Sequence, residues 1–352
     1  GPLKEKQELI DVLLIFGTRP EAIKMAPLIH ALKQDEMLNT KVCVTAQHRE
    51  MLDQVLTAFD IRPDFDLDLM EQGQDLFDVT TQVLLNLRDL LKEIKPQLVL
   101  VHGDTTTSMA AAIACFYLNI PVGHVEAGLR THDLAAPFPE EFNRRVSGLL
   151  TAIHFAPTAK SKQNLINEGV DEACIIETGN TVVDALKWAT LRLETDIELG
   201  SAVDNQLSRS LFFDWKKEKF VLITGHRREN FGDGFKEICK AIADLSVNNP
   251  DVHFVYPVHL NPNVQEPVNR VLSNKSNVHL IAPLEYLFFV RLMSFSYLVL
   301  TDSGGIQEEA PSIGKPVLVM RDVTERPEAV DAGTVRLVGA SRASIRVGIQ
   351  RL

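Results

Sequence analysis

Short apolar runs alternate along this chain with longer stretches whose apolar residues recur at helical spacing. The short runs predict buried strands, and the longer stretches predict amphipathic helices. The predicted strands cover residues 11–16, 41–46, 97–102, 121–126, 152–158, 219–224, 251–258, 277–283, 297–301 and 315–320. The predicted helices cover residues 18–32, 47–59, 76–93, 105–117, 138–150, 233–245, 263–272 and 284–293. Strand after helix after strand predicts an α/β protein with parallel, doubly wound sheets.

The alternation lapses at residues 191–210, which are polar and acidic and contain no clear strand. We interpret this stretch as a surface helix and a connection, with a domain junction near residues 178–190. A chain of 352 residues is long for a single core and suits two α/β domains. The prediction is therefore an N-terminal Rossmann-like domain over residues 10–180 and a C-terminal one over residues 181–352, facing each other across a cleft.

Composition narrows the classes of function. A net charge of −11 and a pI near 5.4 argue against general nucleic-acid binding, which needs clustered positive charge. No apolar run is long enough to span a bilayer, and no signal peptide opens the chain, where Gly1 and Pro2 resemble a cleavage scar. The four cysteines are widely spaced and lie in apolar patterns: Cys43, Cys115, Cys174 and Cys239. They predict buried, reduced thiols in a cytoplasmic protein.

Most of the candidate chemistry lies in residues 102–145, where two predicted strands run into polar loops. Loops at the carboxyl ends of parallel strands form the ligand crevice of such domains. These loops and the helix after them carry three acids, Asp104, Glu126 and Glu140. The same region carries the cationic or titratable side chains His102, His124, Arg130, Arg144 and Arg145. We predict a catalytic edge here; the alternative is a solvated surface of mixed charge.

The first predicted strand also turns directly into a helix. Thr18 is a capping residue, Pro20 suits the first helical turn, and Glu21 completes a capping box. Arg19 and Lys24 therefore lie near a helix amino end, which attracts anions. The alternative is a well-capped helix with two exposed cations.

Two further strand ends lie in the second predicted domain. The segment from Asp302 through Ser303 to Gly304 and Gly305 suits phosphate binding at a helix start, with Glu308 and Glu309 one turn on. The segment with His226, Arg227 and Arg228 suits a diphosphate. The alternatives are a tight glycine turn and a solvated basic turn.

Other kinds of site lack their usual motifs in this sequence. Neither a dinucleotide fingerprint nor a Walker A loop occurs, and the histidines stand singly without metal-site spacing. We therefore expect no nicotinamide cofactor and no metal.

The order of several motifs resembles one family closely. They are GTRPEAIKMAPL, AQHREMLDQ, VHGDTTT, GHVEAGLRT, PEEFNR, TGHRRE, YPVHLNP, TDSGGIQEEAPS and GKPVLVMRDVTERPEAVDAGT, within residues 12–338. Together they resemble the bacterial non-hydrolysing UDP-N-acetylglucosamine 2-epimerases. The resemblance implies a glycosyltransferase-B type of fold, a homodimer, and interconversion of UDP-GlcNAc and UDP-ManNAc for cell-surface polysaccharide. It also implies elimination of UDP to a 2-acetamidoglucal and re-addition, which agrees with the missing dinucleotide fingerprint.

Site residues follow from the resemblance, position by position. Asp104, Glu126 and Glu140 resemble the acid/base carboxylates, and His226 a residue that holds the substrate and the departing UDP. Carboxylates crowded together raise one another's pKa, so we expect one to be protonated at neutral pH. The residues that resemble substrate contacts are Arg19, Lys24, Phe289, Ser303, Gly304, Gly305, Glu309 and Arg326. Many members bind a second UDP-GlcNAc as activator, and the residues that resemble that site are Gln47, His48, Arg228 and His259.

Two features depart from the family. Leu284 stands where a polar residue, often glutamine, precedes the Glu-Tyr pair. The sequence also ends at Leu352, where relatives continue through a helix that crosses back to the first domain. The alternatives left open are a glycosyltransferase of the same fold, a hydrolysing epimerase that releases ManNAc and UDP, and a nucleotide-sugar-binding regulator without catalysis.

Overall fold

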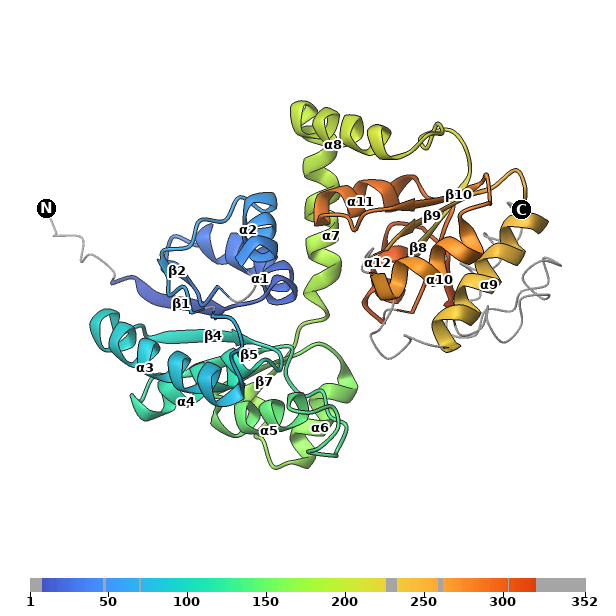
Figure 1. The fold of residues 1–352 in the computed structure, drawn as a ribbon. Coiled ribbons are helices and arrows are strands. Elements are labelled where there is room, and N and C mark those ends of the chain that lie inside the picture. Colours follow the sequence, from blue (N-terminus) through green and yellow to red (C-terminus); the bar gives the residue numbers. More distant parts are fainter. Residues whose placement is uncertain are drawn as a thin grey trace, which may run out of the picture. The chain divides into compact units, whose positions relative to one another are not determined.

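The computed structural model describes residues 8–46, 49–69, 71–225, 233–258, 262–302 and 304–320. The chain divides into two compact units, unit 1 at Gly1–Ala185 and unit 2 at Leu186–Leu352. Each unit is built on its own parallel sheet with helices against it, as Figure 1 shows. The predicted fold class, with two doubly wound Rossmann-like sheets, is confirmed.

The sheet of unit 1 has the strand order β3-β2-β1-β4-β5-β6-β7, with every pair parallel. Its strands are β1 (Ile10–Phe16), β2 (Leu38–Val44), β3 (Phe65–Asp66), β4 (Leu98–His102), β5 (Val122–Val125), β6 (Ile153–Ala156) and β7 (Ile175–Glu177). The central strands are buried apolar runs, as expected of a sheet covered on both faces. The sequence did not predict β3 and β7, because runs of two or three residues carry too little pattern.

The helices of unit 1 are α1 (Arg19–Lys33), α2 (Arg49–Ala58), α3 (Leu76–Ile94), α4 (Thr106–Tyr117), α5 (Glu140–Leu150) and α6 (Ala159–Asn167), with a 3-10 turn at Glu172–Cys174. Helices α1 and α2 lie on one side of the sheet, and α3, α4 and α5 lie on the other (Figure 1). α3 shows why they form: Asp75 caps its start, and Val83, Leu87 and Leu91 bury one face at helical spacing. Lys95 ends it in the left-handed conformation.

The chain reverses its direction of winding between β1 and β4, which are neighbours in the sheet. From β1 it proceeds outward to β2 and β3, and from β4 it proceeds the other way to β5, β6 and β7. Loops that leave neighbouring strands in opposite directions open a crevice at their carboxyl ends. The predicted catalytic loop after β4 therefore starts at this switch point, and the loop after β5 leaves the neighbouring strand.

The sheet of unit 2 has the strand order β10-β9-β8-β11-β12 and is also parallel. Its strands are β8 (Phe220–Thr224), β9 (His253–Pro257), β10 (Val278–Ile281), β11 (Leu298–Thr301) and β12 (Val317–Val319). Its helices are α9 (Asp233–Asn248), α10 (Pro262–Leu272), α11 (Tyr286–Phe295) and α12 (Gly304–Ser312). Apolar residues of β8, β9, β11 and α9 form its core. β8 and β11 are the neighbours at its switch point.

The polar stretch at residues 191–210 is helical. It belongs to α7 (Thr181–Thr195) and α8 (Ile197–Ser210). The side chain of Asp196 caps the start of α8. Within unit 2, α8 is joined to α11 by Arg291, whose Nε lies 2.8 Å from Asp204 Oδ1.

All four cysteines are free thiols. Cys43, Cys115 and Cys239 are buried as predicted, and burial raises the pKa of each to about 12. Cys174 is only half-buried, because it lies in the surface turn before β7, so the prediction of burial was wrong there. None of the helices within the described residues is both long and apolar enough to cross a membrane.

Candidate functional site

The carboxyl edge of the first sheet brings together side chains from α1 and from the loop after β5. Lys24, in the second turn of α1, places its Nζ 2.7 Å from Glu126 Oε2. Glu126 follows β5 directly and has a φ of 63°, a left-handed conformation that costs energy for a residue with a Cβ. Such strain persists only where the surroundings impose it, and here the ion pair with Lys24 helps to do so.

Glu126 is an anion at neutral pH. His102 Nε2, at the end of β4, lies 3.2 Å from Glu126 Oε2, although without the alignment of a hydrogen bond. Burial raises the pKa of Glu126, but the neighbouring His102 and Lys24 outweigh it and lower that pKa to about 2. Its neighbours are Lys24 and His102 and not the other acids, so Glu126 is not the carboxylate that crowding would keep protonated.

Asp104 is held by Arg144 of α5. Arg144 Nη2 and Nε lie 2.7 Å and 3.1 Å from Asp104 Oδ2. The backbone of Asp104 is fixed as well, since Asn143 Nδ2 donates to its carbonyl oxygen at 2.9 Å. The side chain of Asp104 is about one-third exposed, so an oxygen can still face a ligand.

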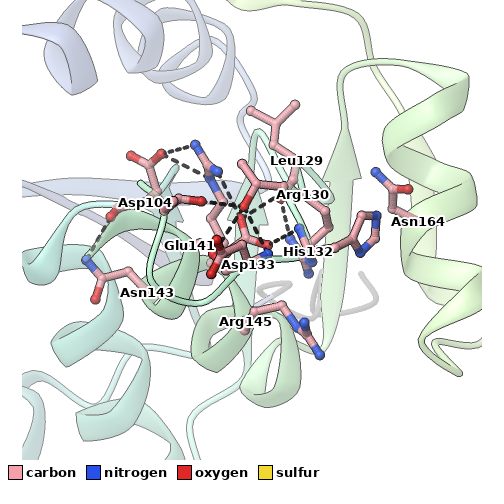
Figure 2. A network of polar contacts seen from close by, with 12 residues as sticks. Asp104, Leu129, Arg130, His132, Asp133, Glu141, Asn143, Arg145 and Asn164 are labelled. Atoms are coloured by element: carbon pink, nitrogen blue, oxygen red, sulfur yellow. Dashed lines mark hydrogen bonds and ion pairs between the residues drawn. The ribbon is translucent and has the colours of Figure 1, made fainter. Parts of the chain in front are cut away.

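Glu141 is a residue that the sequence did not single out. It is fully buried in α5, and its carboxylate accepts from the backbone N–H groups of Thr131 and His132 and from Arg144 Nη1 (Figure 2). Burial raises the pKa of Glu141, and the hydrogen bonds and Arg144 lower it by more. Glu141 thus orients Arg144, which in turn holds Asp104. The i,i+3 spacing of Glu141 and Arg144 was the available signal for this pair.

Glu140 begins α5 and is half-buried. Its Oε2 is buried and has no hydrogen-bond partner among the residues that the structure describes. A buried carboxylate oxygen without a partner costs free energy unless a ligand or water satisfies it. This makes Glu140 a strong candidate for direct contact with a substrate.

Arg19 and Glu21 occupy the start of α1. Arg19 is the first helical residue and is half-buried. The Glu21 part of the predicted capping box is formed, because Glu21 Oε1 accepts from the Thr18 N–H at 3.1 Å and from Thr18 Oγ1 at 2.8 Å. The prediction that Arg19 and Lys24 lie near a helix amino end agrees with this geometry.

A second histidine, His124, contacts the loop that leads to Asp104. His124 Nε2 lies 2.6 Å from the carbonyl oxygen of Gly103, so this nitrogen carries the proton. Burial and the neighbouring His102, His154 and Arg130 lower the pKa of His124 to about 4, against the hydrogen bond to Gly103, which raises it. His124 is therefore a neutral residue that fixes the loop before Asp104.

The switch point of the second sheet lies where β8 and β11 end. Thr224 and Thr301 are buried there, with their hydroxyls 2.8 Å apart. Gly225 has a φ of 83°, and a Cβ built on it would lie 2.1 Å from Asp302 Oδ1. Only glycine fits this turn without displacing Asp302.

Of the other residues predicted to contact substrate, Gly304 and Gly305 form the first turn of α12, and Glu309 lies buried in the same helix. Phe289 lies half-buried in α11. Several predicted site residues lie outside the described residues: Gln47, His48, His226, Arg228, His259, Ser303 and Arg326. Among the described residues, no group of three or more His, Cys, Asp or Glu side chains is arranged to hold a metal ion.

Comparison with known proteins gives consistent results. The family model of UDP-N-acetylglucosamine 2-epimerases matches residues 30–352. The UDP-N-acetylglucosamine 2-epimerase of Yersinia pestis is 59% identical over 341 residues, which are 97% of this chain and 90% of that protein. The enzyme of that name from Escherichia coli K12 is 58% identical with the same coverage.

Solved structures agree in fold. The crystal structure of UDP-GlcNAc 2-epimerase from Neisseria meningitidis, bound to UDP-GlcNAc, is 53% identical and has a TM-score of 0.79, with 97% of this chain and 90% of that chain covered. The two Rossmann-like sheets are thus of the glycosyltransferase-B type. From the matched family model and these identities, this chain belongs to the family of UDP-N-acetylglucosamine 2-epimerases.

Proposed function

We propose that this protein interconverts UDP-GlcNAc and UDP-ManNAc by eliminating and re-adding UDP. The observation that carries the proposal is the first unit's edge, where Asp104 pairs with Arg144 and Glu126 pairs with Lys24, and Glu140 begins the helix that carries Arg144. It is supported by the family membership of the chain. The product would supply ManNAc units for cell-surface polysaccharide.

The chemistry requires a base at the sugar's C2 and a stabilised leaving group at C1. A carboxylate takes the C2 proton, the electrons of that bond form the C1–C2 double bond, and the C1–O bond breaks to release UDP. Return of a proton to the other face of C2 and re-addition of UDP give the epimer. Acid/base side chains contribute to such proton transfers, and cations stabilise the departing diphosphate.

The three carboxylates have different surroundings. With its pKa lowered to about 2, Glu126 does not donate a proton at neutral pH in the free enzyme. The buried oxygen of Glu140, without a partner among the described residues, is the one most in need of a ligand. We propose that Asp104 and Glu140 exchange protons with the sugar, while Glu126 and Lys24 fix its orientation.

The second unit is proposed to hold the UDP moiety. Gly225 and the amino end of α12 suit close approach of a diphosphate to the backbone. His226, Ser303 and Arg326 stay predictions from the resemblance, as do Gln47, His48, Arg228 and His259 for an activating second UDP-GlcNAc.

The protein is further proposed to form a homodimer through α3, α4 and α5, which lie side by side in Figure 1. Large apolar side chains are exposed on all three helices: Leu85, Phe116, Tyr117, Phe142 and Leu149. Exposed apolar groups on adjacent helices are typical of protein interfaces. Light scattering behind size exclusion tests this, since Leu149→Glu should give monomers if these helices form the interface.

The decisive experiment for the function is incubation with UDP-GlcNAc in D₂O, followed by NMR. Deuterium at C2 of both epimers is the expected result. Free ManNAc with UDP would instead identify a hydrolysing epimerase. Binding of UDP without any turnover would identify a regulator and would contradict the proposal.

A further inference from the structure

Glu21 makes contacts beyond those of a capping residue. The side chain is buried, with 2% of the residue exposed. Its Oε1 accepts from the N–H groups of Gly17 and Thr18, at 3.3 Å and 3.1 Å, and from Thr18 Oγ1 at 2.8 Å. This oxygen therefore fixes the turn that joins β1 to α1.

The other oxygen of Glu21 reaches the loop between β4 and α4. Oε2 lies 3.0 Å from Ser108 Oγ and 3.2 Å from Thr105 Oγ1. These hydroxyls belong to the first turn and cap of α4, immediately after Asp104. One carboxyl group thus joins the two loops that open the switch point of the first sheet.

The available protons show in which state Glu21 makes these contacts. Ser108 Oγ lies 2.6 Å from the carbonyl oxygen of His102, which can only accept, so the single hydroxyl proton of Ser108 points there. The contact between Ser108 Oγ and Glu21 Oε2 then needs a proton from the carboxyl side. A neutral carboxyl group donates to Ser108 and still accepts from Thr105, whose hydroxyl also lies 3.0 Å from Ser108 Oγ, so both oxygens of Glu21 are satisfied.

The direction of the pKa shift of Glu21 agrees with this assignment of the protons. Burial raises the pKa of Glu21, and the neighbouring His102 and the hydrogen bonds with Thr18, Ser108 and Gly17 lower it by less. His102 is the titratable group that faces Glu21 from β4. The net direction is upward, toward the protonated form.

We infer that Glu21 is a positioning residue that acts as a neutral carboxylic acid. It donates to Ser108 and ties the start of α1, which carries Arg19 and Lys24, to the loop that carries Asp104. The inference rests on the proposed function for its effect on turnover. It extends that function by assigning the group that sets the distance between the cationic and the acidic parts of the edge.

The test combines infrared spectroscopy with kinetics. Difference infrared spectra of the wild type against Glu21→Gln at pH 7 should show the carbonyl band of a protonated carboxyl group in the wild type. Glutamine keeps an acceptor for Thr18 and a donor for Ser108, so Glu21→Gln should keep kcat within about threefold of wild type. Glu21→Ala should lower kcat about 100-fold, as expected for a misplaced catalytic group, with KM for UDP-GlcNAc nearly unchanged.

Each outcome decides the matter. A carboxylate band in place of the protonated one, or a fall of Glu21→Gln to the level of Glu21→Ala, overturns the neutral acid. Wild-type kcat in Glu21→Ala overturns the positioning role, and so does a lowered melting temperature with unchanged kcat, which a merely structural residue would give.

A second variant guards against misfolding of Glu21→Ala. Ser108→Ala removes the acceptor of the carboxyl proton and should lower kcat about tenfold; wild-type kcat in this variant also contradicts the inference. If the wild type itself fails to epimerise UDP-GlcNAc, the proposed function has failed. The infrared difference then still decides the state of Glu21 by itself.

Discussion

The two switch points of this protein are built from the same topology but from different chemistry. In unit 1, β4 and β5 run into Asp104 and Glu126, whose carboxylates are held by Arg144 and Lys24. In unit 2, β8 and β11 end in a buried pair of threonine hydroxyls and a glycine turn packed against Asp302. The first edge fixes charged side chains, and the second ends in a turn that only glycine fits without displacing Asp302.

In the proposed function, the two edges have different tasks. Proton transfer needs titratable groups at set distances, and cationic partners set both their positions and their pKa values. Holding a diphosphate needs N–H groups and room for close approach, which glycine provides. Substitutions at the first edge should therefore act on turnover, and substitutions at the second should act on UDP affinity.

The largest expected effect is a loss of turnover on substitution of the acids at the first edge. Asp104→Asn, Glu126→Gln and Glu140→Gln should each lower kcat by about 10²–10⁴-fold, because each removes an acid/base or orienting group. UDP affinity, measured by calorimetry, should stay close to wild type. Asp89→Asn on the exposed face of α3 is the matched control and should have no effect. Wild-type kcat in all three variants would refute the assignment of this edge.

Glu141 tests whether the first edge depends on its buried support. Glu141→Ala leaves Arg144 and two backbone N–H groups without their acceptor, which should lower the free energy of unfolding by about 3 kcal/mol. Urea denaturation measures this. Glu266→Ala, which breaks an exposed pair with Arg270, should cost at most about 0.5 kcal/mol. Equal costs would mean that the network around Asp104 is not tightly held.

A pair of glycine variants tests the second edge. Gly225 and Gly314 both have positive φ, but an added Cβ meets Asp302 only at Gly225, while Gly314 has open space. Gly225→Ala should therefore lower the free energy of unfolding by about 1–3 kcal/mol more than Gly314→Ala, and should weaken UDP binding. Unfolding and UDP titrations on both variants separate the contact from the backbone conformation. If both variants bind UDP equally well, the close approach at Gly225 has no role in binding.

The smallest effect concerns pH. The folded pKa of His124, about 4, lies below its unfolded value near 6.5, so its contribution to stability is present above pH 6.5 and is lost as the pH falls toward 4. Between pH 7 and 5.5 the wild type should lose about 1 kcal/mol more than His124→Gln, whose amide can still donate to Gly103 but does not titrate. His132→Gln, at an exposed histidine, is the control and should follow the wild type. Parallel curves for wild type and His124→Gln would show that His124 is not held neutral.

Much of this architecture could be predicted from the sequence. Short apolar runs gave the central strands of both sheets, and the Thr18–Glu21 spacing gave the start of α1. Asp104 and Glu126 could be placed at strand ends because each lies at the end of a short apolar run, and such a run marks where a strand begins and ends.

The sequence could not reveal which groups meet across the fold. Lys24 and Glu126 are 102 residues apart along the chain, and Glu21 and Thr105 are 84 apart. No local pattern records such pairs, because they follow from the order of strands in the sheet.

The sequence by itself thus determined the alternating elements, the strand-end position of the acids and the capped helix beside them, since these depend on spacing along the chain. Only the tertiary structure decided the state of those acids. It placed a cation, and not another carboxylate, beside Glu126, and it buried Glu21 among hydroxyls. The reason is physical: the pKa of a carboxyl group depends on burial and on charges a few ångströms away.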